Sequence, residues 1–248
     1  MIKSFISSPR FKSKWSLVAT LIGLPLLVSG CLNNFDTPPT QPAAYISIYQ
    51  GSPDAPAMDI FANQNRVNNQ PLNFAEVLAY SPFYVGERSF RFSSFNSTTT
   101  LLQKDFTIEQ DAIYSMFVLD RVADLDAILI EDEWTLPSAD SAQVRMVHLS
   151  PDTGEVFLQF SNLSTPVTNN MNFGDDSNFT MVKKNTYNVQ VKSVATGEVL
   201  LSANDVQING NRVYTFVLRG LAETTNQTQK KELQHITNKE KKKKPHNV

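Results

Sequence analysis

The sequence predicts an all-β fold in which one domain occurs twice in tandem, behind a signal peptide for export. Three observations support this prediction. Short segments rich in Val, Ile, Phe, Tyr and Thr alternate apolar with polar residues, which is typical of half-buried strands. The tripeptide Ser-Pro-Asp occurs at residues 52–54 and again at 150–152, each time after an apolar segment. A short apolar run near the N-terminus follows a basic stretch.

The N-terminal region has the parts of a secretory signal peptide. Residues 1–14 carry four basic and no acidic side chains, and residues 15–28 form an apolar run interrupted by Pro25. That run is shorter than the roughly 20 residues that a membrane-spanning helix needs. A basic stretch, a short apolar stretch and small residues at the cleavage point define a signal peptide. Here Ser29 and Gly30 are the small residues, and Cys31 follows directly.

The residues Val-Ser-Gly-Cys at 28–31 resemble the lipobox of bacterial lipoproteins, in which the cysteine is acylated and the chain is cleaved just before it. Cys31 is the only cysteine of the chain, so it has no partner for an internal disulfide. An ordinary signal peptide with an incidental cysteine is the alternative. Acylation with several chains such as palmitate implies a stable membrane anchor at Cys31. Leu32 rather than Asp follows it, which by the sorting rule of such lipoproteins implies the outer membrane, facing either the periplasm or the cell surface.

Charge and composition divide the rest of the chain into a body with two extensions. Residues 31–43 are polar and proline-rich, which predicts an extended tether. Residues 239–248 are lysine-rich and predict a disordered tail, with contact to anionic lipid as an alternative. Each end carries a net charge of +4 and the whole chain −2, which leaves −10 on residues 31–237. Nucleic acid is therefore not an expected partner, because phosphate binding needs a positive surface.

Aligning the two Ser-Pro-Asp motifs at an offset of 98 residues brings further segments together. We therefore predict two copies of one domain, at residues 44–135 and 141–238, joined by a linker at residues 136–140. The matches are Phe83 with Phe179, residues 89–92 with 186–189, residues 113–119 with 213–218 with one residue inserted, and more weakly residues 125–130 with 233–236.

Each copy contains six or seven predicted strands, which is typical of an immunoglobulin-like β-sandwich, although barrels give similar patterns. Phe90 and Phe92 share one face of their strand because side chains alternate across it. Tyr187, Val189 and Val191 do the same in the second copy. The one candidate for a short helix is residues 72–80.

The segments GSPDAPAMDIFA and VRMVHLSPDTGEVFLQF resemble the opening of the DUF4397 domain, a β-sandwich family of bacterial envelope and secreted proteins. Its typical start is an apolar strand, a His, a small residue, Ser-Pro-Asp and a second strand. The second copy keeps the His as His148, whereas the first has Gln50. The resemblance covers nearly all of residues 44–238. It implies a fold and an envelope location, but no biochemical activity.

The repeated motif consists of Ser52, Pro53 and Asp54 in the first copy and Ser150, Pro151 and Asp152 in the second. Proline fixes φ in a turn, and Ser and Asp side chains bond nearby backbone amides, so we interpret both motifs as structural turns. A cation or ligand site at the aspartates is the alternative. His148 shares a face with the preceding apolar residues, and we expect it to be partly buried and bonded to the turn.

Neither catalysis nor a metal centre is expected. A zinc site needs three or four convergent ligands, and the mature chain has three histidines and one lipidated cysteine. His148 and Ser150 are close in sequence, but no G-x-S-x-G elbow is present. The remaining acidic residues fit no calcium-binding loop, and we expect them to line a solvated edge. They are Asp120, Asp124, Asp126, Glu131, Asp132 and Glu133, with a second cluster at Asp175 and Asp176.

The sequence thus predicts a membrane-anchored, non-enzymatic envelope component without a cofactor. Its partners are expected to be the membrane, through lipid on Cys31, and an envelope protein or glycan. A purely structural or adhesive component without a discrete ligand site is the alternative. Tyr45, Tyr49 and Trp134 are candidates for a sugar-binding surface. Asp-Ser-Ala at 140–142 resembles a short O-glycosylation acceptor.

Overall fold

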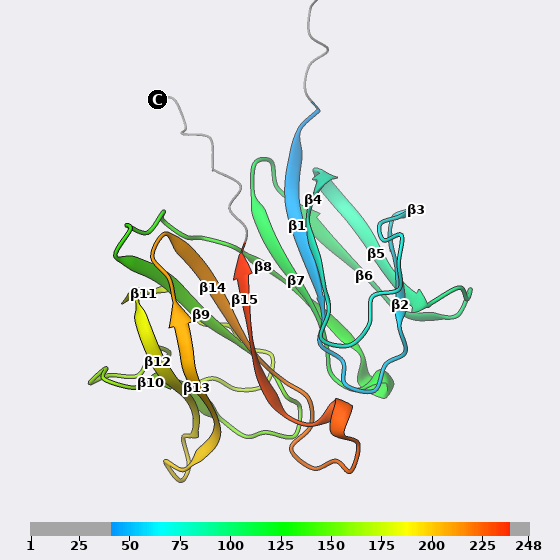
Figure 1. Ribbon diagram of the computed structural model, residues 1–248. Helices are drawn as coiled ribbons and strands as arrows, with labels where there is room; N and C mark the ends of the chain where they lie inside the picture. The colour runs from blue at the N-terminus through cyan, green and yellow to red at the C-terminus, as the bar shows by residue number, and fades with distance from the viewer. Residues whose placement is uncertain (1–40, 239–248) are drawn as a thin grey trace, which may run out of the picture. The chain divides into compact units, whose positions relative to one another are not determined.

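A computed structural model describes residues 41–238 of the chain. The predicted signal peptide, the predicted lipobox with Cys31, nearly all of the predicted tether and the lysine-rich tail lie outside the described residues. Residues 41–238 contain fifteen strands and no α-helix, with two short 3₁₀ turns, η1 (Val122–Asp124) and η2 (Gln227–Gln229) (Figure 1). The prediction of an all-β fold is therefore confirmed. Within the same residues, no helix is long and apolar enough to cross a membrane.

The first eight strands, which we call repeat one, form two sheets. The β1 sheet has the order β4-β1-β7-β8, and the β2 sheet has the order β3-β2-β5-β6. The bounds are β1 (Ala43–Gln50), β2 (Met58–Ala62), β3 (Asn65–Arg66), β4 (Val77–Tyr84), β5 (Gly86–Ser94), β6 (Thr100–Ile108), β7 (Ile113–Leu119) and β8 (Asp126–Glu131).

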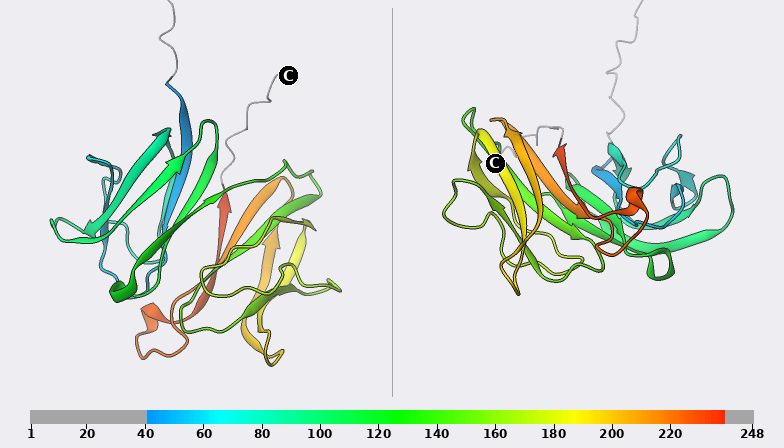
Figure 2. Two further views of the ribbon diagram at one scale, coloured as in Figure 1. Left: turned by 180° about the vertical axis from the view of Figure 1, so that it is seen from behind. Right: turned by 60° about the horizontal axis from the view of Figure 1, so that its bottom comes forward.

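The last seven strands, which we call repeat two, follow the same plan. The β9 sheet has the order β11-β9-β14-β15, and the β10 sheet has the order β10-β12-β13. In Figure 2 the red strand β15 runs beside the orange strand β14, its partner in the antiparallel ladder. The bounds are β9 (Ser141–Leu149), β10 (Val156–Phe160), β11 (Thr180–Lys183), β12 (Asn185–Ser193), β13 (Val199–Ile208), β14 (Arg212–Arg219) and β15 (Glu232–Asn238).

The strand registers identify equivalent residues in the two repeats. β1 pairs in parallel with β7, with Tyr45 opposite Ile113. β9 pairs in parallel with β14, with Gln143 opposite Val213. Both pairs therefore join equivalent residues. The predicted match of residues 113–119 with 213–218 agrees with the register at its start, but Val118 corresponds to Leu218, so the predicted insertion is absent.

Other matches predicted from the sequence are displaced along their strands. Phe83 lies opposite Ala44, whereas the equivalent Ala142 lies opposite Val182, so Phe83 corresponds to Val182 and not to Phe179. Residues 89–92 and 125–130 are each displaced by two positions from their predicted counterparts. A displacement by two keeps every side chain on the same face of a strand, so hydrophobic alternation alone does not detect it.

The predicted helix at residues 72–80 is wrong. Leu72 forms an isolated bridge to Met58, a turn follows, and β4 begins at Val77. Ala75 has φ of 65°, which is incompatible with a right-handed helix. The last four residues of the segment instead belong to β4, where Val77 and Leu78 pair with β1.

Each pair of sheets encloses its own apolar core. In repeat one, Ile46, Ile48, Phe90 and Phe92 are completely buried in one cluster. In repeat two, Tyr187, Val189 and Val191 lie in a second cluster. The faces predicted from period-2 alternation are therefore confirmed at these positions. At roughly 1.5–3 kcal/mol for each large buried side chain, these clusters provide much of the free energy that holds each sheet pair together.

Candidate functional site at the junction of the repeats

The outward faces of the β1 and β9 sheets meet in a third apolar cluster. It consists of Tyr49, Phe117, Leu119, Val147, Leu149 and Val217. Side chains that alternate with the core residues of the same strands point into this junction, which explains why β7 is buried along its whole length. The site described below lies beside this cluster.

A buried ion pair crosses the junction. Arg145 on β9 and Asp132 just after β8 are 1% and 3% exposed, and their side chains meet at 2.5 Å between Nη2 and Oδ1. The guanidinium also stacks over the ring of Phe179, 4.7 Å from its centroid. Removing one partner of such a pair leaves a buried charge and typically costs about 3–5 kcal/mol.

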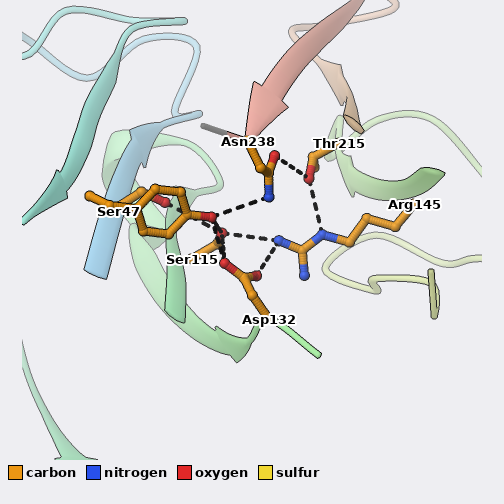
Figure 3. A network of polar contacts seen from close by, with 7 residues as sticks. Ser47, Ser115, Asp132, Arg145, Thr215 and Asn238 are labelled. Carbon is orange, nitrogen blue, oxygen red and sulfur yellow. Dashed lines mark hydrogen bonds and ion pairs between the residues drawn. The ribbon is translucent and has the colours of Figure 1, made fainter. Parts of the chain in front are cut away.

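Hydroxyl and amide groups complete the network around this pair (Figure 3). Ser115 Oγ donates to Asp132 Oδ2 at 2.8 Å and accepts from Arg145 Nη2 at 3.0 Å. Arg145 Nε donates to Thr215 Oγ1 at 3.1 Å, and Thr215 in turn donates to Asn238 Oδ1 at 3.2 Å. Asp132 thus shares its charge among several donors, and side-chain hydrogen bonds link strands of both repeats across the junction.

Tyr80 on β4 joins the same network. Its hydroxyl donates to Asp132 Oδ2 at 2.6 Å and accepts from Asn238 Nδ2 at 3.2 Å. Burial, followed by the negative charge of Asp132, raises the pKa of Tyr80 far above its usual value. Burial also raises the pKa of Tyr49, whose hydroxyl donates to Gln234 at 2.7 Å. Both tyrosines therefore stay neutral hydrogen-bond donors at any physiological pH.

A pocket of about 380 Å³ lies beside the network, and we call it the junction pocket. Both repeats contribute to its walls, which are mainly apolar, and none of its lining side chains carries a formal charge at neutral pH. The lining residues are Ser47, Tyr49, Val77, Ala79, Tyr80, Ser115, Phe117, Thr215, Ile236, Thr237 and Asn238. Small-molecule sites are typically concave, mainly apolar and equipped with a few convergent polar groups.

The aspartates of the Ser-Pro-Asp motifs bind backbone amides of a neighbouring loop. Asp54 accepts a hydrogen bond from Val122 N at 2.8 Å. Asp152 accepts from Ala222 N at 2.8 Å and from Glu223 N at 3.1 Å. Burial acts to raise the pKa of Asp152, but these amides and Arg121 lower it below its usual value. Each aspartate ties the turn after the first strand to the loop after its parallel neighbour, which favours the structural interpretation.

His148 is completely buried, deeper than expected, and bonded to the turn. Its Nδ1 accepts from Ser150 N at 3.3 Å, which leaves Nε2 to donate to Gly154 O at 3.3 Å. Burial lowers its pKa. In repeat one Gln50 makes the equivalent hydrogen bond to the turn: its Oε1 accepts from Ser52 N at 2.6 Å.

The serines of the two motifs differ in their hydrogen bonds. Ser150 Oγ donates to Gly220 O at 2.7 Å and lies 2.7 Å from Thr153 Oγ1. Ser52 Oγ is buried and has no hydrogen-bond partner among the described residues. Both serines are completely buried, and both ring nitrogens of His148 are bonded to backbone groups rather than to a serine hydroxyl.

The expectation that all the acidic residues line a solvated edge is wrong for Asp132. Its carboxylate is buried because Arg145 and the hydroxyls of Tyr80 and Ser115 satisfy it. Asp124, Glu131, Glu133, Asp175 and Asp176 are exposed, and Asp120 and Asp126 are half-buried. Between residues 41 and 238, no three His, Cys, Asp or Glu side chains are placed to hold a metal ion.

The proposed sugar-binding aromatics do not form one surface. Tyr49 is 2% exposed and belongs to the junction cluster. Trp134 packs edge-on against Phe179, and Tyr45 is half-buried in β1. Ser141, in the segment that resembles a glycosylation acceptor, shares a 2.9 Å hydrogen bond with Ser138 Oγ.

Comparison with known proteins identifies part of the chain. Residues 44–159 match the family described as Domain of unknown function (DUF4397). Residues 44–159 form a DUF4397 domain. The DUF4397 match includes all of repeat one except the first residue of β1 and continues through β9 into β10. It therefore ends beyond the boundary at residue 135 that the sequence predicted.

Two further comparisons add little. No curated protein matches the chain. Among solved structures, the chain is similar to the tip fimbrial protein Mfa3 from Porphyromonas gingivalis with C-terminal truncation, at 9% identity and a TM-score of 0.23. That similarity covers 79% of this chain and 99% of the other. We draw neither fold nor function from a TM-score this low.

Sequence reasoning missed Arg145 and the junction pocket. Arg145 stands between Val144 and Met146 in a strand that is buried along nearly its whole length. A charged residue in a buried strand needs a partner, so the position of Arg145 in the sequence indicated that a partner exists. The identity of that partner depends on how the two repeats pack, which no local pattern records.

Proposed function

We propose that this chain is a lipid-anchored, non-enzymatic binding module of the cell envelope, attached to the outer membrane through acylated Cys31. In this proposal the two repeats are tandem immunoglobulin-like sandwiches, and repeat two is a second, divergent DUF4397 domain. The equal strand order of the β1 and β9 sheets supports the last point.

The observation that carries the proposal is the junction pocket. Its volume of about 380 Å³ lies within the range of small-molecule sites, and side chains of both repeats shape it. Its polar groups are hydroxyls and an amide. In the ion pair beside it, Arg145 and Asp132 already neutralise each other. Such a lining suits binding better than proton transfer, because it offers no group that titrates near neutral pH.

A structural spacer or adhesive component remains the second candidate. The junction cluster and the buried network favour it, because they join the repeats through both apolar and polar contacts. A spacer needs this junction but has no use for a ligand in the pocket.

Crosslinking in intact membranes separates the two candidates. The full-length lipidated protein is compared with Ala79→Trp, which fills the pocket from an exposed position of edge strand β4. The matched control is Met181→Trp on edge strand β11, where the methionine is 51% exposed and does not line the pocket. A bound species that is lost only in Ala79→Trp supports the binding module. Identical recovery from all three proteins overturns it and favours the spacer.

A further inference from the structure

The junction is built from equivalent positions of the two repeats. Ser47 lies opposite Ser115 in the β1–β7 ladder, and Arg145 lies opposite Thr215 in the β9–β14 ladder. Ser47 is therefore the counterpart of Arg145, and Ser115 is the counterpart of Thr215. The packing of the β1 sheet against the β9 sheet is thus an isologous contact between two copies of one surface.

The strand ends extend this correspondence. Asp132 N donates to Ile113 O at 2.7 Å, and Asn238 lies opposite Val213, the counterpart of Ile113. Asp132 and Asn238 are therefore counterparts as well. The register makes Ser81 and Thr180 counterparts, and Tyr80 and Phe179 directly precede them in the sequence.

One half of this pseudo-symmetric junction is filled and the other is hollow. In the filled half, the Arg145 guanidinium stacks over Phe179 and binds Asp132, with Ser115 and Thr215 beside it. In the other half Ser47, Tyr80 and Asn238 take the corresponding places, and all three line the junction pocket. The pocket is the space that an arginine would occupy if repeat one had one at position 47.

Resting on the binding function proposed above, we infer that the junction pocket binds a ligand that imitates the Arg145 side chain: an apolar stem with a neutral, planar amide or urea group at its end. The stem replaces the aliphatic part of the arginine along Tyr49, Phe117 and Ile236. The planar group lies against Tyr80 as the guanidinium lies against Phe179.

The polar atoms of the pocket select a neutral group. Asn238 stands where the filled half has an aspartate, so no carboxylate is available to neutralise a cation. Arg145 is already paired with Asp132, so no free cation awaits an anion. One N–H of Asn238 Nδ2 is bonded to Tyr80, and the amide has a second N–H to donate to a carbonyl oxygen. Ser47 Oγ donates to Ser115 and keeps lone pairs for a ligand N–H.

Calorimetric titration with three probes that share a six-carbon stem tests the ligand class: hexylurea, hexylguanidinium and heptanoate. Hexylurea is expected to saturate one site per chain, and the charged probes are expected to bind at least about tenfold more weakly, because a buried unpaired charge is costly. Equal or stronger binding of either charged probe, or no saturable binding of hexylurea, overturns the inference.

Variants that fill the pocket connect the binding to the site. The double variant Ser47→Arg/Asn238→Asp reproduces the filled half and is expected to abolish hexylurea binding. Ala79→Trp is expected to do the same if the double variant does not fold, while Met181→Trp retains binding. Unchanged binding in a folded filled variant overturns the inference. If Ala79→Trp loses the membrane-crosslinked species but the wild-type protein does not bind hexylurea, only the ligand class is refuted. If the wild-type protein binds hexylurea but no crosslinked species is found, only the envelope function is refuted.

Discussion

Asp132 and Asn238 occupy equivalent positions at the ends of β8 and β15, yet only Asp132 faces an arginine. Equivalent positions of the two repeats therefore carry different side chains in the two halves of the junction. Repeat two supplies Arg145 and repeat one supplies its counter-charge, while the opposite half of the junction is neutral and hollow. This asymmetry can be tested by measuring the free energy of unfolding of variants at the junction.

Replacing Asp132 with Asn is expected to lower the free energy of unfolding by about 3–5 kcal/mol, because Arg145 remains buried without a counter-charge. The double variant Asp132→Asn/Arg145→Ser converts this half into the Ser47–Asn238 combination and is expected to recover most of the loss. Urea unfolding measures both. Asp126→Asn, in the half-exposed pair with Lys104, serves as a control with an expected cost below about 1 kcal/mol. A double variant no more stable than the single one would contradict the interpretation.

His148 is expected to make stability depend on pH. Burial lowers its pKa in the folded state, so the unfolded chain binds the proton more readily. The stability from the neutral ring is fully present above the unfolded pKa of about 6.5 and decreases as the pH falls below it, by at most about 1.4 kcal/mol per pH unit. His148→Gln, which copies Gln50, is expected to remove this component between pH 7.5 and 5. Parallel stability curves for both proteins would refute it.

The residue after the aspartate is one difference between the two Ser-Pro-Asp turns. Thr153 bonds to Ser150, whereas Ala55 stands at the same position beside Ser52, whose buried hydroxyl has no partner in the described chain. Ala55→Thr is expected to supply the missing partner and to raise the free energy of unfolding by about 1 kcal/mol. Ala55→Val adds similar bulk without the hydroxyl and is the control. Equal effects of both substitutions in thermal unfolding would attribute the change to packing alone.

The motif aspartates are expected to act without a cation. Asp152→Ala removes two bonds to backbone amides and Asp54→Ala removes one, so losses of about 0.5–1.5 kcal/mol are expected, larger at Asp152. Calcium and EDTA should leave the unfolding curve of the wild-type protein unchanged. A shift with calcium that disappears in either variant would support the cation site instead.

Much of the fold follows from local patterns in the sequence, whereas the site does not. Alternation at Phe90 and Phe92 identifies the core face, because burial repeats with the period of a strand. The helix predicted at residues 72–80 failed, because pairing with β1 outweighs weak local preference. Asp132 looked solvated because its neighbours are charged. Its partner Arg145 lies in the other repeat, and only tertiary packing brings the two together.

The membrane anchor is expected to depend on Cys31 alone. Several acyl chains bury many methylene groups at about 0.8 kcal/mol each, which makes attachment stable, whereas the unmodified chain has no other thiol to acylate. Growth with a labelled fatty acid is therefore expected to label the wild-type protein and leave Cys31→Ala unlabelled and outside the membrane fraction. Leu32→Asp is the matched control, since it keeps the cysteine and is expected to keep the label while leaving the outer membrane. Label on Cys31→Ala that stays with the membrane would place the anchor elsewhere in the chain.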